Sequence, residues 1–299
     1  MSIPGIELHG GELVCVVGPT ASGKTELAIR ICEQVGGEVI NADSVQIYEH
    51  FDLGSGKPTG QELARAVHHL VGVQDPRDPL DAARFASMAD AAIAQVRGRG
   101  KVPVVCGGTF LWVRALVYGL AEAPAGDPVI RERLRAEAQR EGVEALHRRL
   151  SSVDPVTAQR LGPRDLVRIE RALEVFELTG RRLSDIHAEH RRSAPRHQPK
   201  FVSVRWPREE IDRRIEQRAR GWLQGGWLEE VRRLVGMGFR QTRPMASVGY
   251  RQVLDHLEGR LGAEELLGAI VRSTMVFARR QRTWLREIPT CWIDPIWLR

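Results

Sequence analysis

The segment Gly18-Pro19-Thr20-Ala21-Ser22-Gly23-Lys24-Thr25 carries the pattern Gly-x-x-x-x-Gly-Lys-Thr of a phosphate-binding loop, or P-loop. An apolar run at 12–17 precedes it, and helical spacing of apolar residues at 25–32 follows it. The backbone N–H groups of such a loop and the positive end of the helix would face phosphate oxygens. Lys24 would add a charge, and Thr25 would offer a hydroxyl to Mg²⁺. The segment therefore predicts a site for a di- or triphosphate.

Strand and helix patterns alternate after the P-loop. Short apolar runs at 38–41 and 102–106 are typical of buried strands, and 82–96 and 110–118 have helical spacing. This alternation indicates a parallel sheet that is covered on both faces. We therefore predict an α/β fold: a P-loop NTPase-like parallel sheet core flanked by helices.

The pattern changes at 121–128, where an Ala-, Pro- and Gly-rich stretch indicates a boundary. Helices alone follow, at 129–141, 143–151, 155–160 and 165–178, and a second boundary lies at 193–199. A strand at 201–204, helices at 208–222, 227–236, 246–256 and 263–287, and a strand at 290–293 complete the chain. We predict the first part of the core at 1–124, an all-helical insertion domain at 125–198 and the second part of the core at 199–299.

The composition excludes several classes of protein. Apolar residues make up 42% and charged residues 27%, as in ordinary soluble proteins. There is no run of about 18 apolar residues and no signal-peptide pattern, so we expect a cytoplasmic protein without a membrane segment. The cysteines lack the spacing of zinc ligands, so zinc is not expected.

The net charge is unevenly distributed: −4 over 1–126, +4 over 127–200 and +6 over 201–299. Arginine supplies nearly all of the positive charge, because the chain has only four lysines, Lys24, Lys57, Lys101 and Lys200. Since arginine matches phosphate geometry, one interpretation is a polyanionic partner. The alternative is an arginine-rich composition with solvated helix faces, and charge alone favours neither.

Two polar residues follow predicted strands, at the edge where parallel sheets bind ligands. Asp43 ends the strand at 38–41 and could act as a general base or accept a hydrogen bond from a substrate amine. Thr109 comes after Gly107-Gly108, where the missing side chains allow close approach of a ligand. Each residue could instead cap a helix, and position alone leaves both readings open.

Arginine and aromatic residues gather in the C-terminal third, at Ser247-Val-Gly-Tyr-Arg-Gln252 and Arg279-Arg-Gln-Arg-Thr-Trp-Leu-Arg286. This combination suits phosphate contact and base stacking in single-stranded RNA. For 279–286 alone, an amphipathic helix with a charged outer face is the simpler interpretation.

Eight motifs in one order, spanning about 12–293, resemble the bacterial tRNA dimethylallyltransferase (tRNA isopentenyltransferase) family. They are the P-loop, Asp43-Ser-Val-Gln-Ile-Tyr48, Asp52-Leu-Gly-Ser-Gly-Lys-Pro58, Gly107-Gly-Thr109, Arg168-Ile-Glu-Arg-Ala-Leu-Glu-Val175, Arg214-Ile-Glu-Gln-Arg218, Gly249-Tyr-Arg-Gln252 and Arg280-Gln-Arg-Thr-Trp-Leu-Arg286. Departures are few: Trp112 stands where the family often has Tyr, and Gly72 where many members have Asp.

The resemblance implies transfer of a dimethylallyl group from dimethylallyl diphosphate to N6 of adenosine 37, in tRNAs that read codons beginning with U. The products would be N6-(dimethylallyl)adenosine and diphosphate. The P-loop and Arg218 would hold the diphosphate with Mg²⁺ on Thr25, and Lys24 would stabilise its charge. Asp43 would accept a proton or hydrogen bond from N6, and Thr109 would face the reacting channel.

The same resemblance implies a monomer whose helical insertion clamps the tRNA anticodon stem-loop. The implied tRNA-contacting residues are Asp43, Ser44, Val45, Gln46, Thr109, Arg131, Val167, Arg168, Ile169, Glu170, Arg171, Ala246, Ser247, Val248, Gly249, Tyr250, Arg251, Arg279, Arg280, Gln281, Arg282, Thr283, Trp284, Leu285 and Arg286.

Two rival functions share the P-loop. An ATP-dependent nucleotide or small-molecule kinase would bind a nucleotide there, and a non-enzymatic RNA-binding module would use the loop as a switch. The strand at 102–106 ends in Gly-Gly-Thr, whereas many P-loop NTPases have an Asp at that point for the magnesium shell. This difference, with the basic C-terminal part, favours the transferase over the kinase, while the Asp43→Ala variant separates the transferase from the RNA-binding module.

Overall fold

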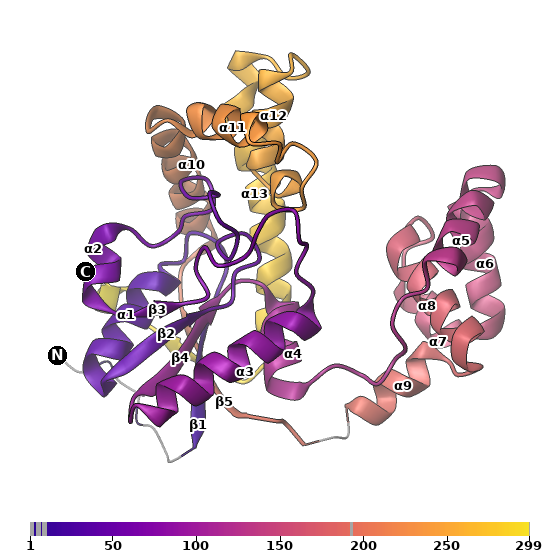
Figure 1. The fold of residues 1–299 in the computed structure, drawn as a ribbon, viewed down its shortest axis with the longest axis horizontal. Helices are drawn as coiled ribbons and strands as arrows, with labels where there is room; N and C mark the ends of the chain where they lie inside the picture. Colours follow the sequence, from indigo (N-terminus) through magenta and orange to yellow (C-terminus); the bar gives the residue numbers. More distant parts are fainter. Residues whose placement is uncertain (1–2, 4–6, 8–10, 192–193, 299) are drawn as a thin grey trace. The chain divides into compact units, whose positions relative to one another are not determined.

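The computed structural model describes residues 3, 7, 11–191 and 194–298. Contacts divide the chain into two compact units, coloured by sequence in Figure 1. The core unit comprises Met1–Val117 and Arg196–Arg299, and the helical unit comprises Tyr118–Pro195. The boundaries predicted from the sequence lie after 124 and 198. The helical unit is therefore an insertion into the chain of the core unit.

A parallel sheet forms the centre of the core unit. Its strands in the described residues run in the order β3-β2-β4-β1-β5-β6. The bounds are β1 Glu12–Val17, β2 Gly37–Asn41, β3 His68–His69, β4 Val102–Gly107, β5 Gln198–Val204 and β6 Thr290–Ile293. β1 lies between β4 and β5, with Val14 opposite Val104 and Cys15 opposite Phe201. The P-loop therefore begins at the end of a central strand.

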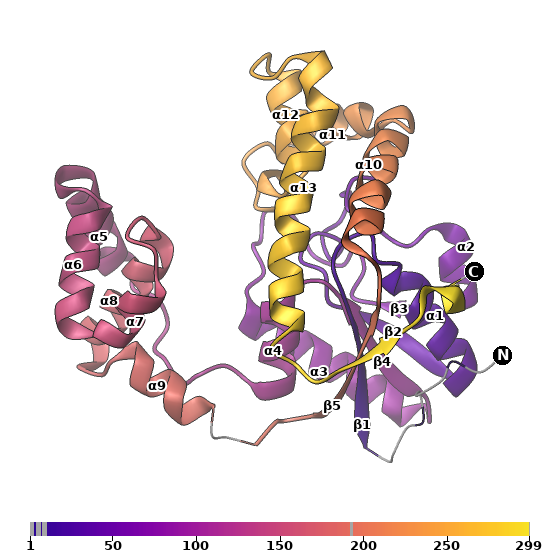
Figure 2. The ribbon, with the colours of Figure 1, turned by 180° about the vertical axis from the view of Figure 1, so that it is seen from behind.

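Helices cover both faces of the sheet. The connection from β1 to β2 contains α1 (Lys24–Val35), and the connection from β3 back to β4 contains α3 (Ala82–Gly98). Because parallel crossovers are right-handed and these two run in opposite directions, they place α1 and α3 on opposite faces. Figures 1 and 2 show α3 in front of the sheet in one view and behind it in the other.

Side-chain alternation builds the core. Val14 and Val16 of β1 pack with Leu27 of α1 in one buried cluster. Cys15, between them, points to the other face and is fully buried. A strand buried on both faces must be apolar at every position, which is why 12–17 could be recognised as a central strand.

Four helices rise from the end of the sheet. Figures 1 and 2 both show α10 (Arg208–Gln224) beside α13 (Ala263–Leu285), with α11 (Trp227–Gly236) and α12 (Tyr250–Leu257) across their far ends. Ile211, Ile215 and Ala278 form a buried cluster between α10 and α13. A fifth helix, α4 (Phe110–Tyr118), follows β4 and contacts α13 through the stacked rings of Phe110 and Trp284.

The helical unit has a core of its own. It contains α5 (Pro128–Glu141), α6 (Val143–Val153), α7 (Pro155–Arg160), α8 (Leu166–Thr179) and α9 (Leu183–His190). Leu134, Leu146, Leu150, Ile169 and Leu173 are buried together. Aspartates cap three of these helices, because Asp127, Asp154 and Asp165 each accept a hydrogen bond from an N–H of the first turn.

Several elements differ from the sequence expectations. The helices α2 (Gly60–Arg65) and α9 (Leu183–His190) were not predicted. α2 buries no side chain, although a capping box at Thr59 and Glu62 begins it. β3 is too short to show a pattern. β5 begins at Gln198 instead of 201, since Pro199 pairs with β1 while β6 starts only opposite Phe201. Among the described residues, no helix is long and apolar enough to cross a membrane.

Candidate active site

The P-loop is fixed from outside by two side chains of the C-terminal part. Arg214 Nε donates to the carbonyl of Ala21 at 2.8 Å, and Trp206 Nε1 donates to the carbonyl of Ser22 at 2.9 Å. The Arg214 guanidinium also lies over the Trp206 ring at 4.7 Å. Both carbonyl oxygens are therefore occupied by side chains outside the loop. The first N–H groups of α1 have no acceptor within the helix, so they are free to bind an anion.

Cations and one carboxylate surround the P-loop. Burial lowers the pKa of Lys24, and the charge of Asp43 partly opposes that shift. Burial also lowers the pKa of Arg218 to about 10, so its guanidinium is protonated at neutral pH. Arg218 donates to the hydroxyl of Thr20 in the P-loop. The structure thus brings Lys24, Arg218 and Asp43 together, as the sequence analysis expected of the site.

Asp43 caps a turn that follows β2. Its Oδ1 accepts hydrogen bonds from the N–H groups of Val45 at 3.0 Å and Gln46 at 3.4 Å. Residues 44–47 form turns, so Asp43 is not a helix cap. No donor among the described residues binds the other oxygen of this carboxylate, Oδ2. Oδ2 can therefore accept a hydrogen bond from a substrate.

Thr109 joins the ends of two strands. Its Oγ1 accepts from the N–H of Ser44 at 2.9 Å and donates to Ser44 Oγ at 3.1 Å. Its own N–H donates to Ala42 at 3.3 Å. The hydroxyl therefore holds the Asp43 turn instead of capping α4.

The glycines before Thr109 are required by close contacts. A Cβ at Gly107 would lie 2.1 Å from the carbonyl oxygen of Ala42, and one at Gly108 would lie 2.4 Å from Gln281 Nε2. The Gln281 side chain accepts from Thr20 N at 2.8 Å and donates to Gly108 O at 2.9 Å. It therefore ties the P-loop to the loop that carries Thr109.

A cavity of about 280 Å³ lies between these loops and the helices above the sheet. Polar groups of Thr20, Asp43, Thr109 and Arg218 line part of it. The rest of the wall comes from Ser44, Val45, Gly54, Ser55, Ile215, Ala219, Trp222, Trp227, Ala246, Ser247, Val248, Ile270, Thr274 and Phe277. The cavity therefore combines an anion site, a carboxylate and an apolar wall.

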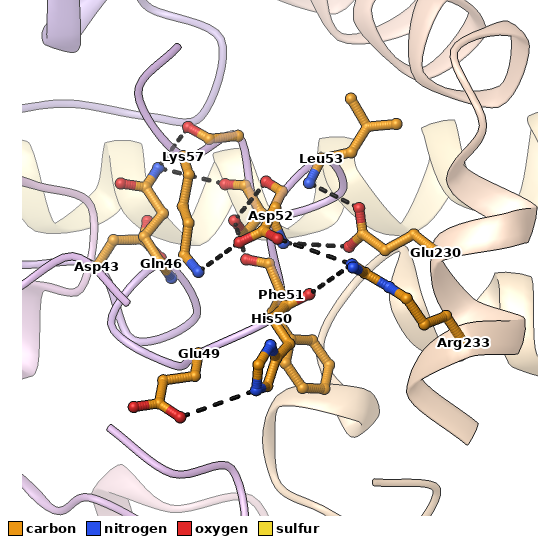
Figure 3. A network of polar contacts seen from close by, with 12 residues as sticks. Asp43, Gln46, Glu49, His50, Phe51, Asp52, Leu53, Lys57, Glu230 and Arg233 are labelled. Atoms are coloured by element: carbon orange, nitrogen blue, oxygen red, sulfur yellow. Dashed lines mark hydrogen bonds and ion pairs between the residues drawn. The ribbon is translucent and has the colours of Figure 1, made fainter. Parts of the chain in front are cut away.

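A buried carboxylate, Glu230 of α11, holds the loop that carries Gly54 and Ser55 (Figure 3). It accepts from Asp52 N at 3.2 Å and Leu53 N at 2.7 Å, and also from the hydroxyl of Tyr250. Burial and the charge of Glu230 raise the pKa of Tyr250, so this phenol stays protonated and donates. Sequence reasoning missed Glu230, because its partners lie far away in the chain.

Lys57 and Gln46 complete the network in Figure 3. Lys57 Nζ pairs with Asp52 at 2.7 Å, and Gln46 Nε2 donates to the carbonyls of Ser55 at 3.2 Å and Gly56 at 2.8 Å. Gly72 lies beside Lys57, since a Cβ there would be 3.2 Å from Nζ. Asp52 therefore supplies the acidic partner for Lys57 in this chain.

Several residues that the resemblance places among the tRNA contacts have buried side chains. Tyr250, Gln281, Leu285, Ile169 and Glu170 are each less than 5% exposed. Gln281 and Tyr250 are used in the contacts above, and Glu170 pairs with Arg135 at 2.8 Å. These side chains support the fold and present no surface to RNA. Trp284 is half-buried against Phe110, with Arg114 over its ring at 5.1 Å.

Other expected contacts lie at the surface. Most of those in the core unit are exposed: Ala246, Val248, Arg251, Arg279, Arg280, Thr283 and Arg286. Two are half-buried, Ser247 and Arg282. Gly249 is buried at φ 93° against Trp227. In the helical unit, Val167 and Arg168 are exposed, while Arg131 and Arg171 both pair with the buried Glu174.

The sheet, the P-loop and the cavity define a P-loop-like α/β protein in which one cavity is lined by both the P-loop and a carboxylate. Profiles described as IPP transferase and isopentenyl transferase match residues 46–288 and 11–70. A tRNA dimethylallyltransferase of Sorangium cellulosum is 61% identical over 93% of this chain and 88% of its own length. One of Anaeromyxobacter dehalogenans is 45% identical over 95% of each chain.

A solved tRNA isopentenylpyrophosphate transferase of Bacillus halodurans aligns at a TM-score of 0.70 and 31% identity, over 95% of this chain and 90% of that one. This chain belongs to the tRNA dimethylallyltransferase family. Members of this family are prenyltransferases.

Proposed function

We propose that the chain transfers a dimethylallyl group from dimethylallyl diphosphate to N6 of adenosine 37 in the anticodon loop of tRNA. One observation carries this assignment: a single cavity contains both the anion site at Thr20 and Arg218 and the carboxylate of Asp43. A prenyl donor needs the first group for its leaving diphosphate, and an attacking amine needs the second.

The leaving group determines the role of the P-loop. As the C1–O bond of the prenyl diphosphate breaks, its electron pair leaves with the diphosphate. Lys24, Arg218 and the N–H groups at the start of α1 stabilise the charge that develops there. The same donors would suit the phosphates of ATP, but the apolar wall of the same cavity suits a hydrocarbon chain and favours prenyl transfer over phosphoryl transfer.

The base supplies the electrons for the new bond. The adenine must leave the anticodon-loop stack to reach a half-buried carboxylate. N6 bonds to C1 of the dimethylallyl group and loses one proton, along the hydrogen bond that the Asp43 carboxylate accepts. Thr109 and Ser44 hold the turn that carries Asp43, so the carboxylate is in place before the base arrives.

Mg²⁺ fits this site through phosphate oxygens. The described residues contain no group of three or more His, Cys, Asp or Glu that could hold a metal alone. Mg²⁺ commonly binds one or two protein oxygens, substrate phosphates and waters. Thr25, in the first turn of α1, would supply the hydroxyl oxygen. When bound, the ion would neutralise charge on the departing diphosphate.

An Asp43→Ala variant tests the assignment. We expect isoprenyl transfer to fall by at least about 10²-fold, the order of a lost positioned acid–base group. Binding of the anticodon stem-loop, measured by fluorescence anisotropy, should stay near wild type. Asp75→Ala, at an exposed site, is the matched control. Transfer at the wild-type rate in Asp43→Ala would exclude this role, and a non-enzymatic RNA-binding module predicts unchanged function.

A further inference from the structure

Trp222 has no part in the chemistry above, although it lines the cavity. The guanidinium of Arg218 lies over its ring at 4.6 Å. The Trp222 and Trp227 rings lie close together, with centroids 5.4 Å apart and planes at 81°. Trp222 therefore contacts both the arginine at the P-loop and a buried aromatic residue of the core unit.

The cavity wall is divided by polarity. From α10, Ile215, Arg218, Ala219 and Trp222 face it at spacings of three and four, which is one stripe of a helix. From α13, Ile270, Thr274 and Phe277 face it in the same way. The carboxylate of Asp43 and the hydroxyls of Thr20 and Thr109 come from loops that follow strands, whereas the hydroxyl of Thr274 on α13 is bound to the carbonyl of Ile270. A prenyl chain has no polar atom, so it belongs on the helical stripes, while an adenine edge belongs on the polar side.

Arg218 and Trp222 are neighbours on one stripe of α10, four residues apart. Since the Arg218 guanidinium lies over the Trp222 ring at 4.6 Å, hydrocarbon attached to a diphosphate at Arg218 has this ring beside it. The whole cavity, about 280 Å³, is slightly smaller than the roughly 300–1,000 Å³ of small-molecule pockets. It suits a short chain with no second isoprene unit.

The Trp222 ring also lies close to the loop that carries Gly56. A Cβ at Gly56, whose φ is 66°, would lie 3.1 Å from Trp222 Cζ2. The loop that carries Gly56 is in turn fixed by Gln46 and, through Asp52 and Leu53, by Glu230. The ring therefore cannot move aside easily for a longer substrate.

We propose that Trp222 is a specificity-determining residue that limits the transferred group to five carbons. This inference rests on the proposed function. The large indole closes the apolar end of the cavity, and its stacking on Arg218 links that end to the diphosphate. A smaller side chain at this position opens the cavity to geranyl diphosphate, which carries the same diphosphate on a ten-carbon chain.

The test compares the two donors with one anticodon stem-loop. The measured quantity is the ratio of kcat/KM for geranyl diphosphate to kcat/KM for dimethylallyl diphosphate, in wild type, Trp222→Ala and Trp222→Leu. We expect the ratio to rise at least about tenfold in Trp222→Ala, since even one methylene changes selectivity by 10–200-fold. Loss of the Arg218 stacking affects both donors equally, so it cancels in the ratio.

Two further variants make the result decisive. Trp222→Phe keeps an aromatic wall and should keep the wild-type ratio more closely than Trp222→Leu. Trp292→Ala removes an exposed tryptophan of β6 and should leave the ratio unchanged. If Trp222→Ala does not fold, the kcat/KM ratio of Trp222→Leu tests the role of Trp222.

The outcomes separate the two claims. A wild-type ratio in a Trp222→Ala or Trp222→Leu protein that still transfers dimethylallyl groups would overturn the role of Trp222. Failure of wild type to transfer any dimethylallyl group would overturn the proposed function instead.

Discussion

Lys24 has an amino group whose charge depends on its surroundings. Burial lowers its pKa below the ordinary lysine value, and Asp43 opposes only part of that shift. Only the protonated amine attracts a diphosphate, and a lowered pKa means that this proton is lost at a lower pH. The binding of the prenyl donor should therefore weaken on the alkaline side before a free lysine would titrate, near pH 10.4.

A Lys24→Arg variant should move this alkaline limb upward, because arginine keeps its proton. The measurement is the pH profile of kcat/KM for dimethylallyl diphosphate, which reports groups of the free enzyme. Lys57→Arg, at a lysine that pairs with Asp52 outside the cavity, is the control. An alkaline limb at the same pH in wild type and Lys24→Arg would contradict the assignment.

Single residues also mark the limit of sequence reasoning. The P-loop, Asp43 and Thr109 could be placed in one site because each follows a recognisable strand. The contacts that hold them could not be placed. Gln281 lies 261 positions from Thr20, and Glu230 lies 177 positions from Leu53. Such pairings depend on how the helices pack, and no local pattern encodes them.

At the scale of elements, the helix α11 stabilises the loop at 52–56 through one carboxylate. Glu230 accepts three hydrogen bonds while less than a tenth exposed. Glu230→Gln replaces one acceptor by an NH₂ group that faces N–H or O–H donors. We expect a loss of about 1–3 kcal/mol in the free energy of unfolding, the cost of an unsatisfied buried donor.

Urea unfolding followed by circular dichroism measures this loss. Glu229→Gln, next in sequence but exposed and paired with Arg232, should change stability by no more than about 0.5 kcal/mol. Equal stability of the two variants would show that Glu230 does not hold the loop.

The elements that the sequence predicted well share one property: each buries a long apolar stripe. The strands at β1 and β4 and the helices α3 and α13 fall in this class. α2 and β3 could not be predicted, because neither has a buried side chain and the sequence therefore shows no apolar periodicity there. The segment at 279–286 has the amphipathic pattern that its sequence predicts, with buried residues such as Gln281 between exposed arginines.

At the scale of the whole molecule, the net charge is positive only after residue 126. Arg279 and Arg286 are exposed on or just beyond α13 and have no acidic partner among the described residues. If they contact tRNA phosphates, each releases about one counterion on binding. The Arg279→Ala and Arg286→Ala double variant should then bind the stem-loop more weakly and reduce the slope of log K against log[salt] by about 2.

Arg220→Ala is the matched control, because that exposed arginine of α10 pairs with Glu216. Its salt slope should stay at the wild-type value. An unchanged slope in the double variant would place the RNA contacts elsewhere on the surface.

The central claim is that the P-loop holds a leaving diphosphate. The most direct measurement offers labelled dimethylallyl diphosphate, with Mg²⁺ and separately with ATP present, to an anticodon stem-loop with adenines at positions 36–38. We expect label in the RNA, one diphosphate released per label, no ATP consumed, and no label when position 37 is guanine. Consumption of ATP with no label in the RNA would contradict the account and favour a kinase.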